Sequence, residues 1–196
     1  MTSRPISLVL ASASPRRLAL LDQIGITPDQ VLATDIDETP RRGELPADYA
    51  RRMAREKAAA AAIHDLAAGA AILAGDTVVA RGRMILPKTE TEDEARQCLA
   101  LLSGRRHRVL GGIALRCPDG RLVARLVTSR VTMKRLSGSE IDSYIATGDW
   151  QGKAGGYAIQ GPAAAMIRHI EGSYSNIVGF SLYDISAMLR GNGLLP

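Results

Sequence analysis

Polar side chains that suit phosphate binding follow the first apolar run of the chain. The run Leu8–Ala11 predicts a buried strand, and Ser12 and Ser14 interrupt it. Ser14 suits the N-cap and Pro15 the first position of a helix that we expect Gly25 to end. The N-terminus of such a helix offers unpaired N–H groups and the positive end of the helix dipole, which favour an anion. The two serine hydroxyls can add hydrogen bonds to the same anion.

Two arginines in the first turn of this helix strengthen the phosphate hypothesis. Arg16 and Arg17 place cations at the positive end of the dipole, which is locally unfavourable. Residues that break a local rule are expected where function requires them. The segment has neither the glycine pattern of a P-loop nor that of a dinucleotide-binding loop. The alternative interpretation is a capped surface helix with two solvated arginines.

Two acidic positions are candidates for metal binding and for activating water. Asp76 interrupts the apolar run Ile72–Val79, where an unpaired acid would be costly to bury, so we favour a functional role over a structural ion pair. Glu38 lies beside Asp37 in the acidic loop 35–40, for which a solvated surface is the alternative. Carboxylates without His or Cys partners suit Mg²⁺ or Mn²⁺, with Glu38 and Asp76 as the preferred ligands. Asp76 could also take the proton of a water that attacks phosphorus.

Lysine is rare in this arginine-rich chain, and a retained lysine can serve as a compact point charge for phosphate. Lys88 follows a proline in a turn, and Lys153 lies in a glycine-rich loop, so both could contact phosphate oxygens. Surface lysines kept by chance are an equal alternative. Lys57 lies in a long helical segment, off the apolar stripe that runs from Tyr49 to Ile63, so we expect it to point along a cleft.

The elements that must position these residues alternate early in the chain and then change in character. Apolar runs predict strands at 8–11, 30–34, 71–79, 107–117, 122–133 and 165–170. Further helices are expected from Pro46 to a stop at Gly69, from the N-cap Thr91 through Leu102, after the N-cap Ser137, and from the end of a polar loop at Gly172–Asn176 to about Leu189. Glu94 and Glu140 stand where each would complete a capping box.

This order of elements predicts an α/β fold with one mixed, twisted sheet and flanking helices. We expect a single domain over residues 1–196. The two longest strands flank a Pro-Asp-Gly turn and predict a hairpin. That hairpin and the helix after it could form a second lobe, which would leave an active-site cleft between two lobes.

The composition narrows the class of protein. The 196 residues are 46% hydrophobic and 23% charged, which is typical of a globular domain. Aromatic residues make up 4% and disfavour a single-strand binder built on aromatic stacking, while the net charge of +5 suits anionic ligands in general. Cys98 and Cys117 match no metal or redox spacing, and the three histidines are dispersed. Because no signal peptide or membrane-length run is evident, we expect a cytoplasmic protein.

Several ordered motifs together resemble one known family. The segment 10–17, LASASPRR, resembles the opening signature of the Maf (septum-formation-inhibitor) family of nucleoside triphosphate pyrophosphatases. Further motifs follow in that family's order and spacing: Glu38, Glu56-Lys57-Ala58, 76–79, Lys88, 103–107, 153–161 and 172–174. The resemblance covers nearly the whole chain. It implies a fold similar to inosine triphosphatase, commonly a homodimer, and hydrolysis of a nucleoside triphosphate to a monophosphate and pyrophosphate with a divalent metal.

The resemblance also implies roles for individual residues. The family's catalytic base matches Asp76, and the residues matched by Arg16, Thr77 and Gln160 accompany a preference for dTTP and UTP over 7-methyl-GTP. The amide of Gln160 suits this preference, because it can pair with the imide N–H and one carbonyl of thymine or uracil together. Gly152 before Lys153, where the family often has an acid, is one of a few departures.

Two other function classes remain as alternatives. The first is a non-enzymatic regulator of cell division that binds nucleotides or nucleic acid, as the family's name suggests. The chain lacks the motifs of a helix-turn-helix or zinc finger, so nucleic acid is an unlikely partner. The second is a phosphatase that removes terminal phosphates, which would release orthophosphate in place of pyrophosphate.

Overall fold

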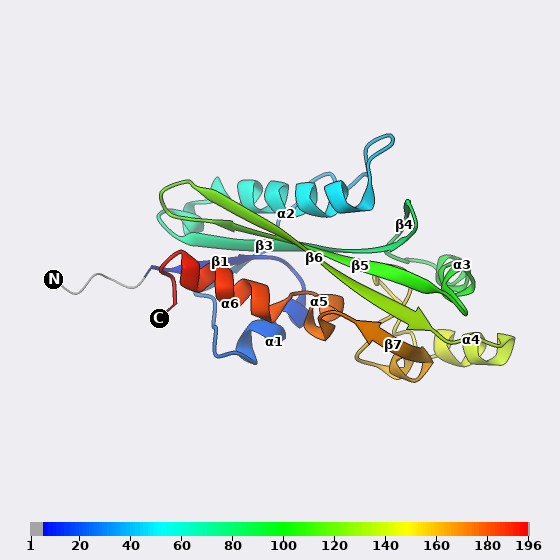
Figure 1. Ribbon diagram of the computed structural model, residues 1–196. Coiled ribbons are helices and arrows are strands. Elements are labelled where there is room, and N and C mark those ends of the chain that lie inside the picture. Colours follow the sequence, from blue (N-terminus) through cyan, green and yellow to red (C-terminus); the bar gives the residue numbers. More distant parts are fainter. Residues whose placement is uncertain (1–5, 196) are drawn as a thin grey trace.

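The computed structural model describes residues 6–195, which form a seven-stranded mixed sheet with helices on both faces (Figure 1). The sheet order is β2-β1-β3-β5-β6-β7, and β4 pairs with β3 off this path. β1 is parallel to β2 and β3, whereas the pairs β3–β4, β3–β5, β5–β6 and β6–β7 are antiparallel. The strands are β1 (Leu8–Ala11), β2 (Gln30–Leu32), β3 (Ala71–Arg81), β4 (Met84–Leu86), β5 (Arg106–Arg116), β6 (Leu122–Met133) and β7 (Ile167–Glu171).

The helices divide between the two faces of the sheet. The longest helix, α2, covers one face, and α1, α5 and α6 lie against the other, while α3 and α4 lie at the far end of the long hairpin (Figure 1). Within residues 6–195, no helix is long and apolar enough to cross a membrane. The α-helices are α1 (Pro15–Asp22), α2 (Pro46–Ala62), α3 (Glu92–Leu102), α4 (Gly138–Ile145), α5 (Tyr174–Val178) and α6 (Leu182–Gly191), with short 3-10 helices at Asp65–Ala67 and Pro162–Met166.

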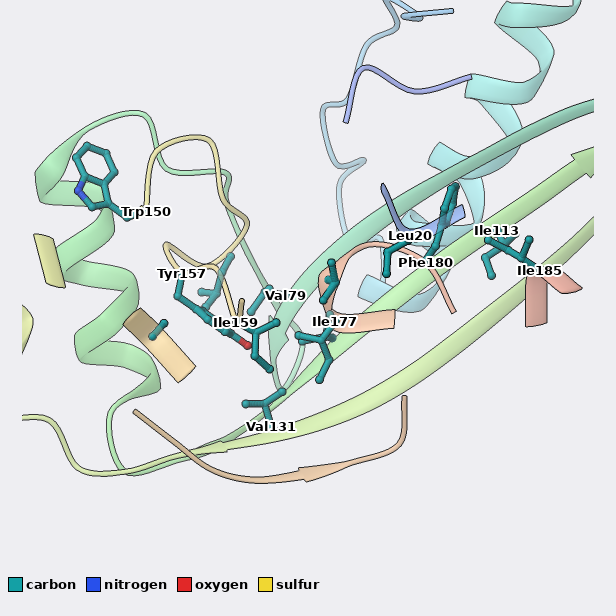
Figure 2. Close-up of a cluster of buried hydrophobic side chains, with 14 of the residues drawn as sticks. Leu20, Val79, Ile113, Val131, Trp150, Tyr157, Ile159, Ile177, Phe180 and Ile185 are labelled. Carbon is teal, nitrogen blue, oxygen red and sulfur yellow. The ribbon is translucent and has the colours of Figure 1, made fainter. Parts of the chain in front are cut away.

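Alternation along β3 directs its side chains to two separate clusters. Ile72 and Ala74 pack with Ala54 and Ala58 of α2 on one face. Leu73 belongs to the larger cluster on the opposite face, part of which is drawn in Figure 2. Because side chains alternate along a strand, consecutive residues further along β3 also project to opposite faces. A site built on neighbouring residues of β3 can therefore draw partners from both helical layers.

One edge of β3 has a gap in its ladder. β5 pairs with β3 along one edge from Ile72 to Ala80. On the other edge, β1 pairs with residues 71–74 and β4 with residues 79–81. The four residues between these two ladders, 75–78, have no neighbouring strand on that edge. Asp76 and Thr77 in this segment line a cavity beside the sheet.

The predicted mixed sheet with flanking helices is confirmed, as are the hairpin and both capping boxes. Three boundary predictions are wrong. The helix expected to reach Gly69 ends at Ala62, because His64 Nδ1 accepts the N–H of Leu66 and starts a 3-10 turn. The strand expected from residue 165 begins at Ile167, after the second 3-10 helix. The polar loop expected at 172–176 contains α5, whose N-cap Ser173 accepts the N–H of Asn176.

Candidate active site

A cavity of about 760 Å³ opens at the gap in the β3 ladder. Its wall contains every residue that the sequence analysis proposed for the site: Ser12, Ser14, Arg16, Arg17, Glu38, Lys57, Asp76, Thr77, Lys88, Lys153 and Gln160. These residues come from the loop after β1 and the start of α1, from the acidic loop before α2, from α2 and β3, from the turn after β4, and from the glycine-rich loop after α4. The cavity therefore lies between the N-terminal half of the chain and that loop, as expected for a cleft.

Lys57 links the two candidate carboxylates. It projects from α2 and is 7% exposed, and its Nζ lies 2.7 Å from Asp76 Oδ1 and 2.8 Å from Glu38 Oε1. Glu38 Oε2 also receives a 2.5 Å contact from Lys88 Nζ. The buried acid in β3 is thus paired with an ammonium group, which offsets the cost of burying it. Asp76 Oδ2 accepts no hydrogen bond from the described residues, so one oxygen of this carboxylate remains available.

The expectation that Lys57 points along a cleft is confirmed, since it lines the cavity, but the apolar stripe expected on its helix is wrong. The buried face of α2 includes Ala50, Ala54, Lys57 and Ala61, whereas Ile63 at the end of the expected stripe is 87% exposed. Lys57 therefore lies on the face that packs against the sheet. It reaches the cavity because Asp76 alternates onto the same face as Ile72 and Ala74.

The charge balance around Glu38 keeps this acid ionised. Although burial raises its pKa, hydrogen bonds from Lys57 and Lys88 outweigh that effect and lower the pKa of Glu38 to about 2. The loop that carries Glu38 is fixed by α2, because Tyr49 Oη donates to the Glu38 carbonyl oxygen at 2.7 Å. Glu38 is therefore held as an anion at the mouth of the cavity.

The two acids fit a divalent metal that binds together with its substrate. Within residues 6–195, no cluster of three or more His, Cys, Asp or Glu side chains is arranged to hold a metal. Mg²⁺, however, commonly takes one or two carboxylates and completes its shell with water and substrate phosphates. Glu38 and Asp76 each place an oxygen within 2.8 Å of the same ammonium group, so the two carboxylates are close enough to serve such an ion.

The two arginines of α1 have different surroundings. Arg17 is 8% exposed, and its guanidinium donates to the Gly179 carbonyl oxygen, Ser12 Oγ and Thr77 Oγ1 at 3.2, 3.0 and 3.2 Å. It also lies over the ring of Phe180, 5.1 Å from the centroid. Burial lowers the pKa of the Arg17 guanidinium, and the negative charge of Asp76 partly opposes this effect. Arg17 therefore ties the loop after β1 to β3 and to the end of α5.

Arg16 is the freer of the two cations. It lines the cavity, and its buried Nε has no hydrogen-bond partner among residues 6–195. Burial lowers the pKa of its guanidinium, since no carboxylate offsets the loss of water. An unpartnered guanidinium at a helix N-terminus beside a cavity is a strong attraction for a phosphate.

The predicted N-cap position of Ser14 is confirmed, with Pro15 starting α1, but among the described residues the Ser14 side chain makes no capping hydrogen bond. Instead its N–H donates to Ser12 Oγ at 3.2 Å. The Ser12 oxygen accepts this bond as well as one from Arg17, so its own hydroxyl hydrogen remains available for a ligand.

The glycine-rich loop forms the opposite wall. Thr89, next to Lys88, fixes it through a 2.7 Å bond from its hydroxyl to the Trp150 carbonyl oxygen. Lys153 Nζ donates to the Gln151 carbonyl oxygen, and burial followed by repulsion from Arg16 lowers the pKa of Lys153. Gln160 is exposed at the rim of the cavity, in the turn before the second 3-10 helix.

The sequence analysis did not identify two features of this wall. The first is Asp149, whose half-buried carboxylate lines the cavity. The second is an apolar surface on which Tyr157, Ile159 and Ile177 lie near Val79, as Figure 2 shows. An acid within a glycine-rich loop was the available signal for Asp149. The apolar surface had no local signal, because its members are far apart in sequence.

His107 lies behind this wall and not in the site. Its Nε2 lies 2.7 Å from Tyr157 Oη, and its buried Nδ1 has no partner. Burial lowers the pKa of His107 to about 4. This histidine is therefore neutral near pH 7 and supports the ring of Tyr157.

Comparison with known proteins places the chain among relatives of similar length. The dTTP/UTP pyrophosphatase of Paramagnetospirillum magneticum is 61% identical over 189 residues, which cover 96% of this chain and 98% of that protein. The dTTP/UTP pyrophosphatase of Rhodospirillum rubrum is 58% identical over 189 residues, which cover 96% of this chain and 89% of that protein. The alignments therefore extend over nearly the whole chain.

Solved structures with much lower identity share the fold. The Staphylococcus aureus Ham1 protein aligns with a TM-score of 0.53 at 17% identity, over 94% of this chain and 98% of that one. A HAM1 protein from Coxiella burnetii gives a TM-score of 0.52 at 17% identity, over 95% and 99%. The family model described as Maf-like protein matches residues 7–192. From this match and the two close relatives it follows that the chain belongs to the Maf family.

Proposed function

We propose that this protein hydrolyses dTTP and UTP to the nucleoside monophosphate and pyrophosphate. The observation that carries the proposal is a buried acid with one free oxygen, Asp76, in the same cavity as the unpartnered guanidinium of Arg16. The relatives named dTTP/UTP pyrophosphatase support the choice of substrate, since they are similar over nearly the full chain.

Asp76 acts as the general base in this proposal. One carboxylate oxygen is held by Lys57, which fixes the orientation of the group. The other oxygen accepts a proton from a water molecule as that water attacks the α-phosphorus. The bond between the α-phosphorus and the oxygen that bridges to the β-phosphate then breaks, and pyrophosphate leaves with that oxygen and its electron pair.

Cations on both sides of the cavity bind the triphosphate. Arg16 and Lys88 approach from the two edges of the gap in β3, and Lys153 from the glycine-rich loop. Lys57 lies between the two acids and is placed to contact the phosphate nearest the attacking water. Ser12 and Ser14 supply hydroxyl groups. Arg17 bonds Ser12 and also Thr77 of β3, so it holds the loop after β1 against that strand. Charge-assisted bonds of this kind strengthen as charge moves onto the leaving pyrophosphate.

A divalent metal, Mg²⁺ or Mn²⁺, completes the proposed site. Glu38 and Asp76 would hold it, and the ionised state of Glu38 suits this task. When bound, the metal would draw charge from the phosphoryl oxygens. Chelation with EDTA is expected to abolish turnover, and added Mg²⁺ or Mn²⁺ to restore it.

Gln160 contributes to the choice of base. Its exposed amide at the rim can pair with thymine or uracil once the base covers it. The apolar surface around Tyr157 and Ile177 provides a wall for the rest of the nucleoside. Substitution of Gln160 by alanine is expected to reduce the preference for dTTP and UTP over CTP.

The decisive experiment identifies the product. Purified protein is incubated with dTTP or UTP and Mg²⁺, and pyrophosphate and orthophosphate are measured separately. Release of pyrophosphate with the monophosphate supports the proposal. Orthophosphate as the first product would instead indicate cleavage of the terminal phosphate. Binding without any hydrolysis, or salt-sensitive binding to DNA, would favour the non-enzymatic regulator.

A further inference from the structure

A carboxylate without a hydrogen-bonding partner faces the cavity from the glycine-rich loop. Asp149 follows α4 and is half-buried. No hydrogen bond or ion pair from the described residues reaches its carboxylate oxygens. Lys153 attracts it electrostatically, but the Lys153 ammonium donates to the Gln151 carbonyl oxygen at 2.8 Å. The oxygens of Asp149 are therefore available to accept hydrogen bonds from a ligand.

The carboxylate lies directly beside the residue that follows Gln160. A Cβ atom added to Gly161 would lie 2.2 Å from Asp149 Oδ2. The φ of Gly161 is −102°, which other residues adopt without strain. A larger residue at this position would therefore have to displace the Asp149 carboxylate, which a flexible side chain allows. The contact places an acceptor beside the backbone at Gly161, and Asp149 and Gln160 line the same cavity.

We propose that Asp149 determines base specificity by accepting the imide N–H of thymine or uracil. An ionised carboxylate accepts hydrogen bonds and donates none. Thymine and uracil present an N–H between two carbonyl groups, so Asp149 accepts from the N–H while the Gln160 amide donates to a carbonyl oxygen. Cytosine presents an unprotonated nitrogen at the same position. The lone pair of that nitrogen would face the carboxylate oxygen. Cytosine would therefore lose the hydrogen bond and would also be repelled by the carboxylate.

This inference rests on the proposed function and extends it, since it assigns the base-reading acceptor to a second residue. A contact between Asp149 and a sugar hydroxyl is the competing use of the same acceptor. That contact would serve every nucleotide alike and would not discriminate between bases. The two uses are separated by comparing bases on the same sugar.

The test compares kcat/KM for dTTP and dCTP in the wild type, Asp149→Asn and Gly161→Ala. The asparagine amide can turn an N–H toward cytosine, so the dTTP-to-dCTP ratio is expected to fall about tenfold. The methyl group of Gly161→Ala displaces the carboxylate without changing its charge, and the ratio is expected to fall again. Asp142→Asn is the matched control, because Asp142 is exposed on α4 and pairs with Arg96 away from the cavity. This control is expected to keep the wild-type ratio.

Binding supplies a readout that does not depend on hydrolysis. Calorimetry compares α,β-imido-dUTP with α,β-imido-dCTP for the same four proteins. An unchanged base preference in Asp149→Asn, or an equal loss for both bases, overturns the role of Asp149. Absence of pyrophosphate release by the wild type would instead overturn the proposed function, and the binding comparison would still test the residue.

Discussion

The ammonium group of Lys57 holds two acids that would otherwise repel each other. Asp76 is 4% exposed, so removal of Lys57 would leave a buried carboxylate without its ion-pair partner. Glu38 keeps a second cation, Lys88, and is less dependent on Lys57. Each acid can thus be altered separately, and the two alterations have different consequences.

Asp76→Asn is expected to lower kcat by about 10²–10⁴-fold while nucleotide binding stays close to that of the wild type. The amide keeps the shape of the side chain and an oxygen for Lys57, but it cannot take a proton from water at neutral pH. Single-turnover rates and the affinity for an imido analogue measure the two effects. Turnover similar to that of the wild type would show that another group activates the water.

The contrast between Arg16 and Arg17 gives a second prediction. Arg16→Ala is expected to raise KM for a triphosphate at least tenfold and leave the melting temperature unchanged, since its guanidinium lacks protein partners at Nε. Arg17→Ala is expected to lower the free energy of unfolding by about 2–3 kcal/mol, because three protein acceptors lose a buried donor. Thermal denaturation and KM measured on both variants test this separation. Equal effects of the two substitutions on stability would contradict it.

At the scale of elements, α2 holds the acidic loop in place. Arg52 donates from Nε and Nη2 to the Glu44 carboxylate at 2.7 Å each, and to the Thr39 carbonyl oxygen at 3.1 Å. Its guanidinium also lies over the ring of Tyr49, which bonds the Glu38 carbonyl oxygen. These contacts with α2 fix the position of the loop, and α2 also carries Lys57. One rigid element therefore fixes both the acid and its cation.

Tyr49→Phe is expected to loosen this loop and lower kcat/KM about fivefold, since one hydrogen bond is worth about 1 kcal/mol. The phenylalanine ring keeps the contact with Arg52, so the change is limited to the bond with the Glu38 carbonyl oxygen. Amide hydrogen exchange of residues 36–42 should accelerate. Tyr183→Phe is the control, because Tyr183 is 82% exposed on α6. Unchanged exchange and unchanged kcat/KM would show that the loop holds its position without this bond.

The sequence predicted those elements that carry their own local signals. Capping residues such as Thr91 and Ser137 fix where a helix starts, and a Pro-Asp-Gly turn fixes a hairpin. The buried face of α2 was not predictable in this way, because alanines such as Ala54 and Ala58 give a weak apolar stripe. The N-cap at Ser173 was available but lay in a polar segment that resembled a loop.

At the scale of the whole molecule, the site forms where the sheet changes partners. The candidate residues could be proposed from their types and from the family resemblance. Their arrangement in space could not be predicted. It depends on β1 and β4, which pair with β3 on one edge and leave residues 75–78 unpaired on that edge. Close packing also sets this region: a Cβ at Gly75 would lie 2.4 Å from the ring of Phe180. The same Cβ would lie 2.9 Å from the Gly112 carbonyl oxygen, so Gly75 admits both a core side chain and the close approach of the neighbouring backbone.

His107 makes the stability of the whole molecule depend on pH. Burial lowers its pKa from the ordinary 6.5 to about 4 in the folded protein. Between these two values the unfolded chain binds a proton that the folded chain does not, so the free energy of unfolding falls as pH falls from about 6.5 to about 4. A shift of this size corresponds to about 3 kcal/mol over the whole interval.

His107→Phe is expected to remove this contribution. Denaturant unfolding of the wild type and the variant at pH 7.5 and pH 4.5 should show a stability difference that shrinks at the lower pH. The lost bond to Tyr157 adds a penalty that does not vary over this range. Tyr157→Phe is the matched control, because it removes the same bond but keeps the buried imidazole and hence the pH dependence. If the difference between wild type and His107→Phe were constant with pH, His107 would bind its proton equally well in the folded and unfolded chains.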